Sequence, residues 1–298
     1  MRIGRYMWSR KGDMGNKSFW INTIRVIESR FNIYNRVSIS KYKDNLSAIE
    51  KRPWNIHLEL SNICNSNCVF CAYQYMTRPK TIMSDAIFNK SLDDYCDIGG
   101  GIVMLEVVVG EPTTDNMFLE RIRKVRARKE VTSIETITNG ILLHKYNMKE
   151  LVNSGISKIK ISIPAFREDI YIQVYRNPNY AKVKENVRSL LEANMASGCP
   201  VDITISFRSP ISYRETLTTP DYLAIKYLQH KTEFNTDYDT WLGNIKQEDV
   251  PKGMIVRKET ALSKEPCYLL YDGPDVYSDG KVGLCSCRDF NLADTRIN

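Results

Sequence analysis

From residue 53 onward, the chain alternates between two patterns of hydrophobic positions. Five stretches show the alternating or continuous apolar pattern of β-strands, at residues 54–60, 102–109, 133–138, 156–163 and 201–207. In the intervals, apolar residues recur at the three- and four-residue spacing of a helix face. Strands that alternate with helices predict βαβ crossovers and a parallel sheet, built either as a barrel or as a doubly wound layer.

Four helices are predicted between these strands. One begins at Ser84 with Asp85 in its first turn, one has its apolar positions within 118–125, one covers 148–153 before Gly155, and one covers 181–196 before Gly198. Residues 1–52 are rich in Asn, Arg and Lys, and an amphipathic stretch at 19–31 predicts a helix there. No function is visible in this N-terminal extension.

The composition is that of a folded globular protein. Of the 298 residues, 43% are hydrophobic and 26% are charged, which excludes disordered and collagen-like chains. The basic start has neither the apolar core nor the cleavage site of a signal peptide, and no apolar stretch approaches the roughly 20 residues that cross a bilayer. We therefore expect a cytoplasmic protein with no membrane partner.

The net charge of +7 raises the question of an acidic partner. Six basic residues lie close together on and just after the second predicted helix: Arg121, Arg123, Lys124, Arg126, Arg128 and Lys129. We interpret them as a solvated outer helix face, with binding of nucleic acid or anionic lipid as the alternative. No RNA-binding or helix-turn-helix motif supports that alternative, so no nucleic-acid partner is expected.

Three cysteines directly follow the first predicted strand. Cys64, Cys68 and Cys71 have the spacing C-x3-C-x2-C, and thiolates this close in one loop can converge on a metal centre. A structural zinc ion takes four ligands, whereas this loop offers three, and His57 belongs to the preceding strand. The spacing favours a four-iron cluster with one iron left free, with a zinc site or buried thiols as alternatives.

The cysteine loop resembles that of the radical S-adenosylmethionine (radical SAM) enzymes, in which a C-x3-C-x-aromatic-C loop follows the first barrel strand. Phe70 occupies the aromatic position. The resemblance implies an α/β fold with a partial, open (β/α)6 TIM-like barrel, a [4Fe-4S] cluster on the three cysteines, and S-adenosylmethionine on the free iron. It also implies reductive cleavage of this cofactor to a 5′-deoxyadenosyl radical, which removes a hydrogen atom from the substrate.

A second match follows the second predicted strand. Gly110, Glu111 and Pro112 resemble the family's Gly-Gly-Glu-Pro turn, whose backbone and carboxylate hold the amino group of the cofactor. Val109 replaces the first glycine of that motif, which reduces the room for a close backbone approach.

Weaker matches lie at the ends of the later strands. Asn139 belongs to a Thr-Asn-Gly segment that resembles the family's TNG, and Ser162 stands where many members place a ribose-binding hydroxyl. Ser206 and Arg208 close the fifth strand, and Arg208 suits the carboxylate of the cofactor or an anionic substrate. The resemblance therefore implies cofactor contacts for Phe70 and for these four residues.

A further group of cysteines lies near the end of the chain. Cys267, Cys285 and Cys287 surround an Asp279-Gly280 turn that predicts a hairpin. The spacing C-x12-G-x4-C resembles the start of the auxiliary-cluster domains called SPASM and twitch, which implies an auxiliary [4Fe-4S] cluster. Those domains continue with further cysteines, so we expect this region to be incomplete here.

The predicted organisation has four parts. They are an N-terminal extension at 1–52, the radical SAM barrel at 53–235, a linker at 236–262 and the SPASM- or twitch-like region at 263–298. In the linker, Asp237, Tyr238, Asp239 and Trp241 either line the substrate opening or pack between the domains.

The resemblance leaves two substrate classes open, a small molecule and a peptide matured by a SPASM-type enzyme. We favour oxidation or epimerisation of a small polyol or aminosugar, because residues 1–52 are too short for a leader-peptide recognition domain. Cys287 is a candidate hydrogen donor for epimerisation if its thiol is free. A flavodoxin or ferredoxin is the implied electron donor, and a non-catalytic iron–sulfur or zinc protein is the alternative from another class.

Overall fold

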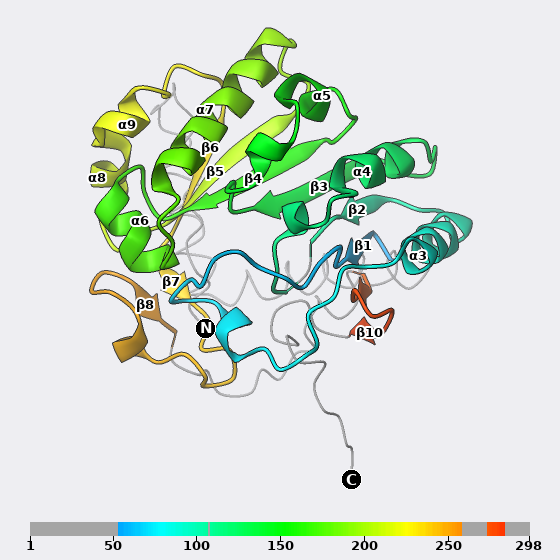
Figure 1. Ribbon diagram of the computed structural model, residues 1–298, viewed down its shortest axis with the longest axis horizontal. Helices are drawn as coiled ribbons and strands as arrows, with labels where there is room; N and C mark the ends of the chain where they lie inside the picture. Colours follow the sequence, from blue (N-terminus) through cyan, green and yellow to red (C-terminus); the bar gives the residue numbers. More distant parts are fainter. Residues whose placement is uncertain (1–52, 107, 258–272, 284–298) are drawn as a thin grey trace, which may run out of the picture.

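Six parallel strands follow one another across the central sheet in chain order: β1 (Asn55–Leu58), β2 (Ile102–Met104), β3 (Ser133–Thr138), β4 (Lys158–Ile163), β5 (Asp202–Arg208) and β6 (Lys231–Asn235). The computed structural model describes residues 53–106, 108–257 and 273–283. Within them, β9 (Asp275–Val276) pairs in parallel with β1, and β10 (Val282–Gly283) pairs antiparallel with β9. Within these ranges the eight-stranded sheet stays open between β6 and β10, so the predicted α/β class and partial parallel barrel are confirmed (Figure 1).

The helices follow the outer side of the curved sheet (Figure 1). They are α3 (Asp85–Asp97), α4 (Phe118–Arg126), α5 (Met148–Val152), α6 (Glu168–Tyr175), α7 (Tyr180–Ala196), α8 (Tyr213–Thr218) and α9 (Pro220–Leu223). Two further strands, β7 (Asp237–Tyr238) and β8 (Ile255–Val256), form a separate parallel pair. Among the described helices, none combines the length and the apolar composition that a bilayer span requires.

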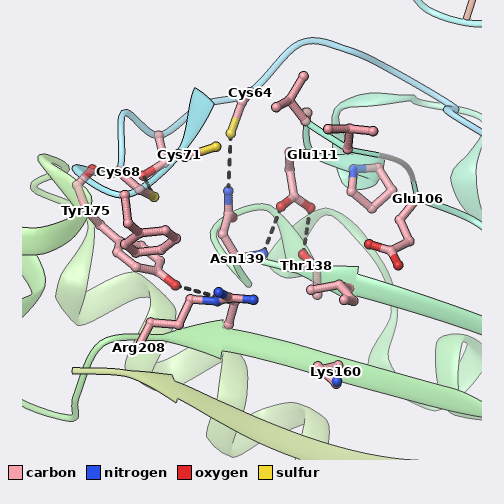
Figure 2. A pocket seen from close by; sticks show the side chains of 18 of the residues that line it. Cys64, Cys68, Cys71, Glu106, Glu111, Thr138, Asn139, Lys160, Tyr175 and Arg208 are labelled. Carbon is pink, nitrogen blue, oxygen red and sulfur yellow. Dashed lines mark hydrogen bonds between the residues drawn. The ribbon is translucent and has the colours of Figure 1, made fainter. Parts of the chain in front are cut away.

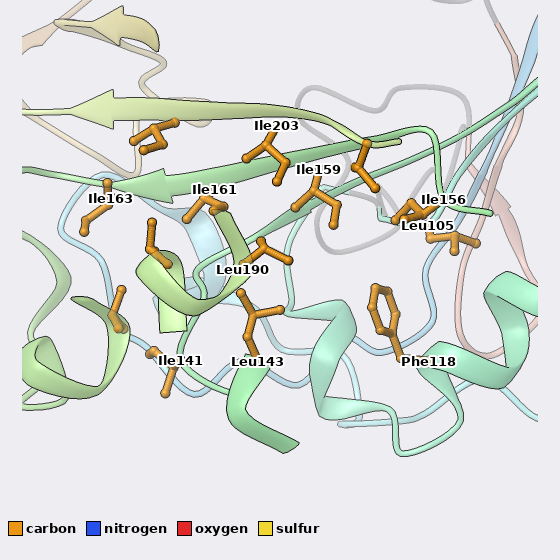
Figure 3. Packing of buried hydrophobic residues seen from close by; sticks show 14 of the residues in the cluster. Leu105, Phe118, Ile141, Leu143, Ile156, Ile159, Ile161, Ile163, Leu190 and Ile203 are labelled. Atoms are coloured by element: carbon orange, nitrogen blue, oxygen red, sulfur yellow. The ribbon is translucent and has the colours of Figure 1, made fainter. Parts of the chain in front are cut away.

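Alternate residues of each strand divide the sheet into two faces. On β4, Ile159, Ile161 and Ile163 are at most 2% exposed and join the hydrophobic core beneath the helices (Figure 3). Lys160 and Ser162, between them in sequence, lie on the concave side and stay partly exposed. The branched apolar side chains face the helices because only that side removes them from water.

Most predicted elements are present at the expected positions. Four of the five predicted strands agree with observed strands to within two residues at either end, and Ser84 caps α3 by accepting a hydrogen bond from the N–H of Ile87. The prediction for 102–109 is wrong in its second half, because β2 ends at Met104 and Val109 packs beside Ala72 of the cysteine loop. Strand β6 and helices α6, α8 and α9 were not predicted.

The prediction of a solvated basic helix face is wrong for Arg121. This residue of α4 is 2% exposed, its Nε lies 2.7 Å from Oδ2 of Asp115, and its guanidinium covers the ring of Phe88. Arg123 and Arg128 remain exposed, and each pairs with an acidic residue of a neighbouring helix. The charge of Arg121 is therefore used inside the protein and is not available to an acidic partner.

The hairpin predicted around Asp279 and Gly280 is present between β9 and β10. The N–H of Tyr277 donates to the carbonyl of Lys281 at 2.9 Å, and Gly280 has a φ of +84° in the turn. The hairpin extends the sheet next to β1, so the end of the described chain lies beside the first strand of the barrel (Figure 1).

The burial of Ile161 on β4 and the exposure of Ile255 on β8 predict different effects for two substitutions. Ile161→Ala should lower the free energy of unfolding by about 2–5 kcal/mol, because it opens a cavity in the core. Ile255→Ala, at a position 54% exposed, should change it by less than about 0.5 kcal/mol. Urea denaturation measures both values, and similar losses for the two variants would contradict the placement of Ile161 in the core.

Candidate functional site

A cavity of about 470 Å³ lies on the concave side of the sheet, at the carboxyl ends of the parallel strands (Figure 2). Its lining includes a polar or thiol group from each parallel strand or from the loop that follows it: Cys64, Cys68 and Cys71 after β1, Glu106 and Glu111 after β2, Thr138 and Asn139, Lys160 and Ser162, Arg208, and Glu233 and Asn235. Parallel α/β folds bind ligands at this edge. The volume is in the range of cofactor and small-molecule sites.

The cysteine loop is anchored on the C-terminal end of α6. The hydroxyl of Ser66 donates to the carbonyl of Tyr175 at 2.9 Å, and the N–H of Val69 donates to the carbonyl of Val174 at 2.9 Å. Ser66 Oγ also lies 3.4 Å from Cys68 Sγ. These contacts fix the direction in which the loop presents its thiols.

Burial keeps all three thiols of the loop in the uncharged form. It is the main cause that raises the pKa of Cys64 and of Cys71, and it raises the pKa of Cys68 to about 12. A thiol in such surroundings releases its proton when a metal cation binds. Among the described residues, no three His, Cys, Asp or Glu side chains converge closely enough to hold one metal ion. Thiolates are the usual ligands of iron–sulfur clusters, so this donor set fits a cluster that Cys64, Cys68 and Cys71 would hold.

The Gly-Glu-Pro turn approaches the cysteine loop closely. Gly110 has a φ of +123°, and a Cβ atom there would lie 2.3 Å from the carbonyl oxygen of Ser61. The position therefore requires glycine. The N–H of Glu111 donates to the carbonyl of Ile63 at 2.9 Å, which joins the turn to the loop.

The carboxylate of Glu111 is 2% exposed and is held by hydrogen bonds (Figure 2). Its Oε1 accepts from the N–H and hydroxyl of Thr113 and from the hydroxyl of Thr138, the last at 2.6 Å. Its Oε2 accepts from the N–H of Asn139 at 2.8 Å. Burial raises the pKa of Glu111, and these donors oppose that rise. Oε2 keeps the capacity for a further donor from the cavity.

Asn139 connects the third strand to the cysteine loop. Its side-chain amide donates to Oδ1 of Asn65 at 2.7 Å and lies 4.0 Å from Cys64 Sγ. The amide oxygen accepts from the N–H of Ile141 at 3.0 Å, which fixes the orientation of the side chain.

Ser162 and Arg208 form one hydrogen-bonded unit with Tyr175. Ser162 Oγ lies 2.7 Å from the hydroxyl of Tyr175 and accepts from Nε of Arg208 at 3.1 Å. The guanidinium of Arg208 stands over the ring of Phe70 at 5.3 Å. This unit holds a positive charge at the cavity wall near the cysteines.

Phe70 packs between the loop and the linker. Its ring stacks on Tyr238 with centroids 5.0 Å apart, and the indole N–H of Trp241 donates to the carbonyl of Phe70 at 2.9 Å. Asp237 and Asp239 line the cavity together with these two aromatic residues. These four residues therefore line the cavity, and Tyr238 and Trp241 also pack on the cysteine loop.

The cavity brings together the three loop cysteines and all but one of the predicted cofactor-binding residues: Phe70, Gly110, Glu111, Pro112, Asn139, Ser162 and Arg208. Ser206 does not line it, because this residue is 1% exposed and its hydroxyl accepts from the amide of Asn235. Cys267, Cys285 and Cys287 lie outside the described residues.

Glu106 is a cavity residue that the sequence patterns did not identify. It lies within a stretch predicted as a buried strand, and it lines the cavity because it follows the alternation in which Val103 and Leu105 are buried beneath the helices (Figure 2). Burial raises the pKa of its carboxyl from an ordinary 4.5 to about 7, and the charges of Lys160 and Arg208 oppose the rise. Within the described ranges, no side chain forms a hydrogen bond or ion pair with this carboxylate.

The chain is similar in sequence to a known family and to several curated proteins. The sequence model of the Radical SAM superfamily matches residues 58–208, about half of the chain. Two similar curated proteins are GTP 3′,8-cyclases. The one from Alkaliphilus metalliredigens is 25% identical over 152 residues, covering 50% of this chain and 46% of that one. The one from Petrotoga mobilis is 24% identical over 182 residues, covering 59% and 55%. The chain spans about half the length of the curated relatives it matches.

Solved structures with the same fold include two with bound ligands. Streptococcus suis SuiB bound to precursor peptide SuiA aligns with a TM-score of 0.58 and 14% identity, covering 86% of this chain and 64% of SuiB. Native anSMEcpe with bound AdoMet aligns with a TM-score of 0.54 and 15% identity, covering 81% and 76%. At these identities the similarity concerns the fold alone.

The raised pKa of Glu106 predicts a pH-dependent stability. Between pH 4.5 and about 7, the folded protein holds a proton that the unfolded chain has released, so stability falls as the pH rises through this window. Glu106→Gln removes this contribution. Urea denaturation of both proteins across the window should show the parent losing stability relative to the variant. A difference that stays constant with pH would contradict the assignment.

Proposed function

The chain belongs to the radical SAM superfamily, and from this premise we propose that it binds a [4Fe-4S] cluster and S-adenosylmethionine in the cavity. Together they would serve to abstract hydrogen from a small polar substrate. The observation that carries the proposal is that three partly buried thiols and the buried Glu111 carboxylate line one cavity, with a hydrogen bond joining the cysteine loop to the Gly-Glu-Pro turn. The cluster would be held by Cys64, Cys68 and Cys71.

When bound, the cluster and S-adenosylmethionine supply a one-electron cleavage that yields methionine and a 5′-deoxyadenosyl radical, which takes a hydrogen atom from a substrate C–H bond. The residues of the chain would bind the cofactor and orient it in the cavity. Oε2 of Glu111, with one donor already in place, would accept a hydrogen bond from the cofactor's ammonium group. Ser162 and Arg208 would bind its ribose hydroxyl and carboxylate.

The charges of the cavity wall support a polyol or aminosugar as the substrate class. Besides Glu59, which pairs with Arg78, the described lining has five carboxylates and three cations: Glu106, Glu111, Glu233, Asp237 and Asp239 against Lys160, Arg208 and Arg257. Such a wall can bind hydroxyl and amino groups on several sides. It would repel a nucleoside triphosphate, the kind of substrate for which the GTP 3′,8-cyclases are named.

Glu106 is our candidate for the group that accepts a proton from the substrate. Oxidation of an alcohol removes one hydrogen atom, one proton and one electron, so a base must stand near the reacting carbon. A carboxylate with a pKa of about 7, and with no hydrogen-bond or ion-pair partner among the described residues, can take up a proton near neutral pH. In the oxidative route, the electron would pass to the auxiliary cluster proposed at Cys267, Cys285 and Cys287. In epimerisation, a free Cys287 thiol would give a hydrogen atom to the substrate radical, and one electron from the flavodoxin or ferredoxin donor, with one proton, would restore the thiol.

A pair of cysteine variants tests the cluster. After anaerobic reconstitution, the parent should contain about four irons per chain for one cluster, or about eight for two. It should form 5′-deoxyadenosine when S-adenosylmethionine and a reductant are added. Cys68→Ala should lose the iron of the loop cluster, about four irons per chain, together with this product. Cys199→Ala should keep both, because Cys199 lies outside the cavity and donates to Gln229. Zinc in place of iron, or parent-like product formation by Cys68→Ala, would contradict the proposal.

A pair of glutamate variants tests the cofactor contact. Glu111→Gln should raise the Kd for S-adenosylmethionine by about tenfold or more, because it removes a charged acceptor. Glu135→Gln is the matched control, since this carboxylate of β3 pairs with Lys158 and does not line the cavity. Calorimetric titration of the reconstituted proteins measures both values. An unchanged Kd for Glu111→Gln would remove the carboxylate from the cofactor site.

A further inference from the structure

The two chain segments that flank the cysteine loop are bonded to each other. The N–H of Met83 donates to the carbonyl of Leu60 at 2.9 Å, and the N–H of Asn62 donates to the carbonyl of Thr81 at 3.2 Å. The side chain of Asn62 also donates to the carbonyl of Pro79 and accepts from the N–H of Thr81. All three cysteines therefore lie in a loop that a short antiparallel stem closes.

A buried ion pair lies beside this stem. Arg78 donates two hydrogen bonds to the carboxylate of Glu59, at 2.9 and 2.6 Å, and the two side chains are 6% and 1% exposed. A two-pronged pair of this kind fixes the relative direction of the two chain segments that carry it. Loss of one partner would leave a charge buried without compensation.

The C-terminal hairpin completes the surroundings of this pair. Ser278 donates both its N–H, at 3.0 Å, and its hydroxyl, at 2.8 Å, to Oε1 of Glu59. The guanidinium of Arg78 stands over the ring of Tyr277 at 4.7 Å, and the N–H of Glu59 donates to the carbonyl of Val276. One carboxylate thus connects the two segments flanking the cysteine loop to a hairpin 219 residues away along the chain.

We propose that Glu59, Arg78 and Ser278 form a latch that couples docking of the hairpin at 273–283 to the order of the cysteine loop. They are positioning residues for the thiols, and the hairpin is a working part of the site. The inference rests on the proposed function only in treating the loop as the cluster site. Because coupling between two sites is reciprocal, cluster binding should stabilise the docked hairpin as much as docking stabilises the loop.

Thiol alkylation of the apoprotein tests the latch without a cluster. In Ser278→Ala, iodoacetamide should modify Cys64, Cys68 and Cys71 about tenfold faster, the change expected when a local opening loses one hydrogen bond to a charged group. Arg78→Lys, which keeps the charge but not the two-pronged geometry, should act in the same direction. Cys96 and Cys199, outside the loop, should react at the parent rate, as mass spectrometry of each site would show.

Two control variants separate a local effect from general destabilisation. Ser212→Ala removes an exposed serine–glutamate hydrogen bond at the start of α8, far from the loop in sequence, and it should leave all alkylation rates unchanged. Ile161→Ala weakens the core and should raise the rates at Cys96 and Cys199 along with those in the loop. The latch is refuted if Ser278→Ala leaves the loop thiols unchanged, or if it accelerates all the cysteines equally, as Ile161→Ala does.

Hydrogen exchange tests the reciprocal effect. Reconstitution with iron and sulfide should slow amide exchange in residues 273–283 of the parent, and Ser278→Ala should abolish most of this change. If the parent takes up no iron, the proposed function fails while the alkylation experiment still decides the latch. If it takes up iron and the hairpin exchanges as before, the coupling is refuted while the proposed function stands.

Discussion

The site depends on two carboxylates that are buried together with their hydrogen-bond donors. Glu59 and Glu111 are 1% and 2% exposed, and removing a carboxylate from water costs several kcal/mol unless protein donors replace the solvent. Each accepts four hydrogen bonds within the described part of the chain. Glu111 joins the Gly-Glu-Pro turn to the end of β3, and Glu59 joins β1 to the C-terminal hairpin. The hydrogen bonds that these two carboxylates accept therefore hold in place the segments that surround the three thiols.

The inner, concave face of the sheet has charged side chains, whereas the outer face, which packs on the helices, has apolar ones. In a closed (β/α)8 barrel, apolar side chains fill the interior, so it contributes to the core. Here the inner face has ion pairs between strands, with Lys158 bonded to Glu135 at 2.6 Å and Lys160 to Glu233 at 3.0 Å. The stability of the sheet therefore comes mainly from the helix side. The charges inside contribute little to folding and are available to select a ligand.

The two faces also explain how far the fold could be predicted. On β4, the alternation of Ile159, Ile161 and Ile163 with polar residues marks a strand without knowledge of its neighbours, because one face is fully buried. Strand β6 has the sequence KTEFN, with no buried residue, and its place follows only from pairing with β5. Arg121 has helical spacing within a basic run, yet its burial depends on Asp115, which lies before the helix. Local pattern predicts an element well, but not which charges tertiary contacts bury.

The residues of the candidate site also divide into those that a local pattern predicts and those that only tertiary contacts reveal. The spacing of Cys64, Cys68 and Cys71 and the turn at Glu111 could be predicted, because each is a short motif whose chemistry depends on its own residues. The contact between Glu59 and Ser278 could not, since 219 residues separate them and neither belongs to a motif. Glu106 was missed for a third reason: within an apolar run, a single carboxylate has the appearance of a tolerated strand residue. It faces the cavity because Val103 and Leu105 are buried on the helix side, and the next residue of the alternation lies on the concave side. The alternation that buries Val103 and Leu105 therefore also determines which acid the cavity presents to a substrate.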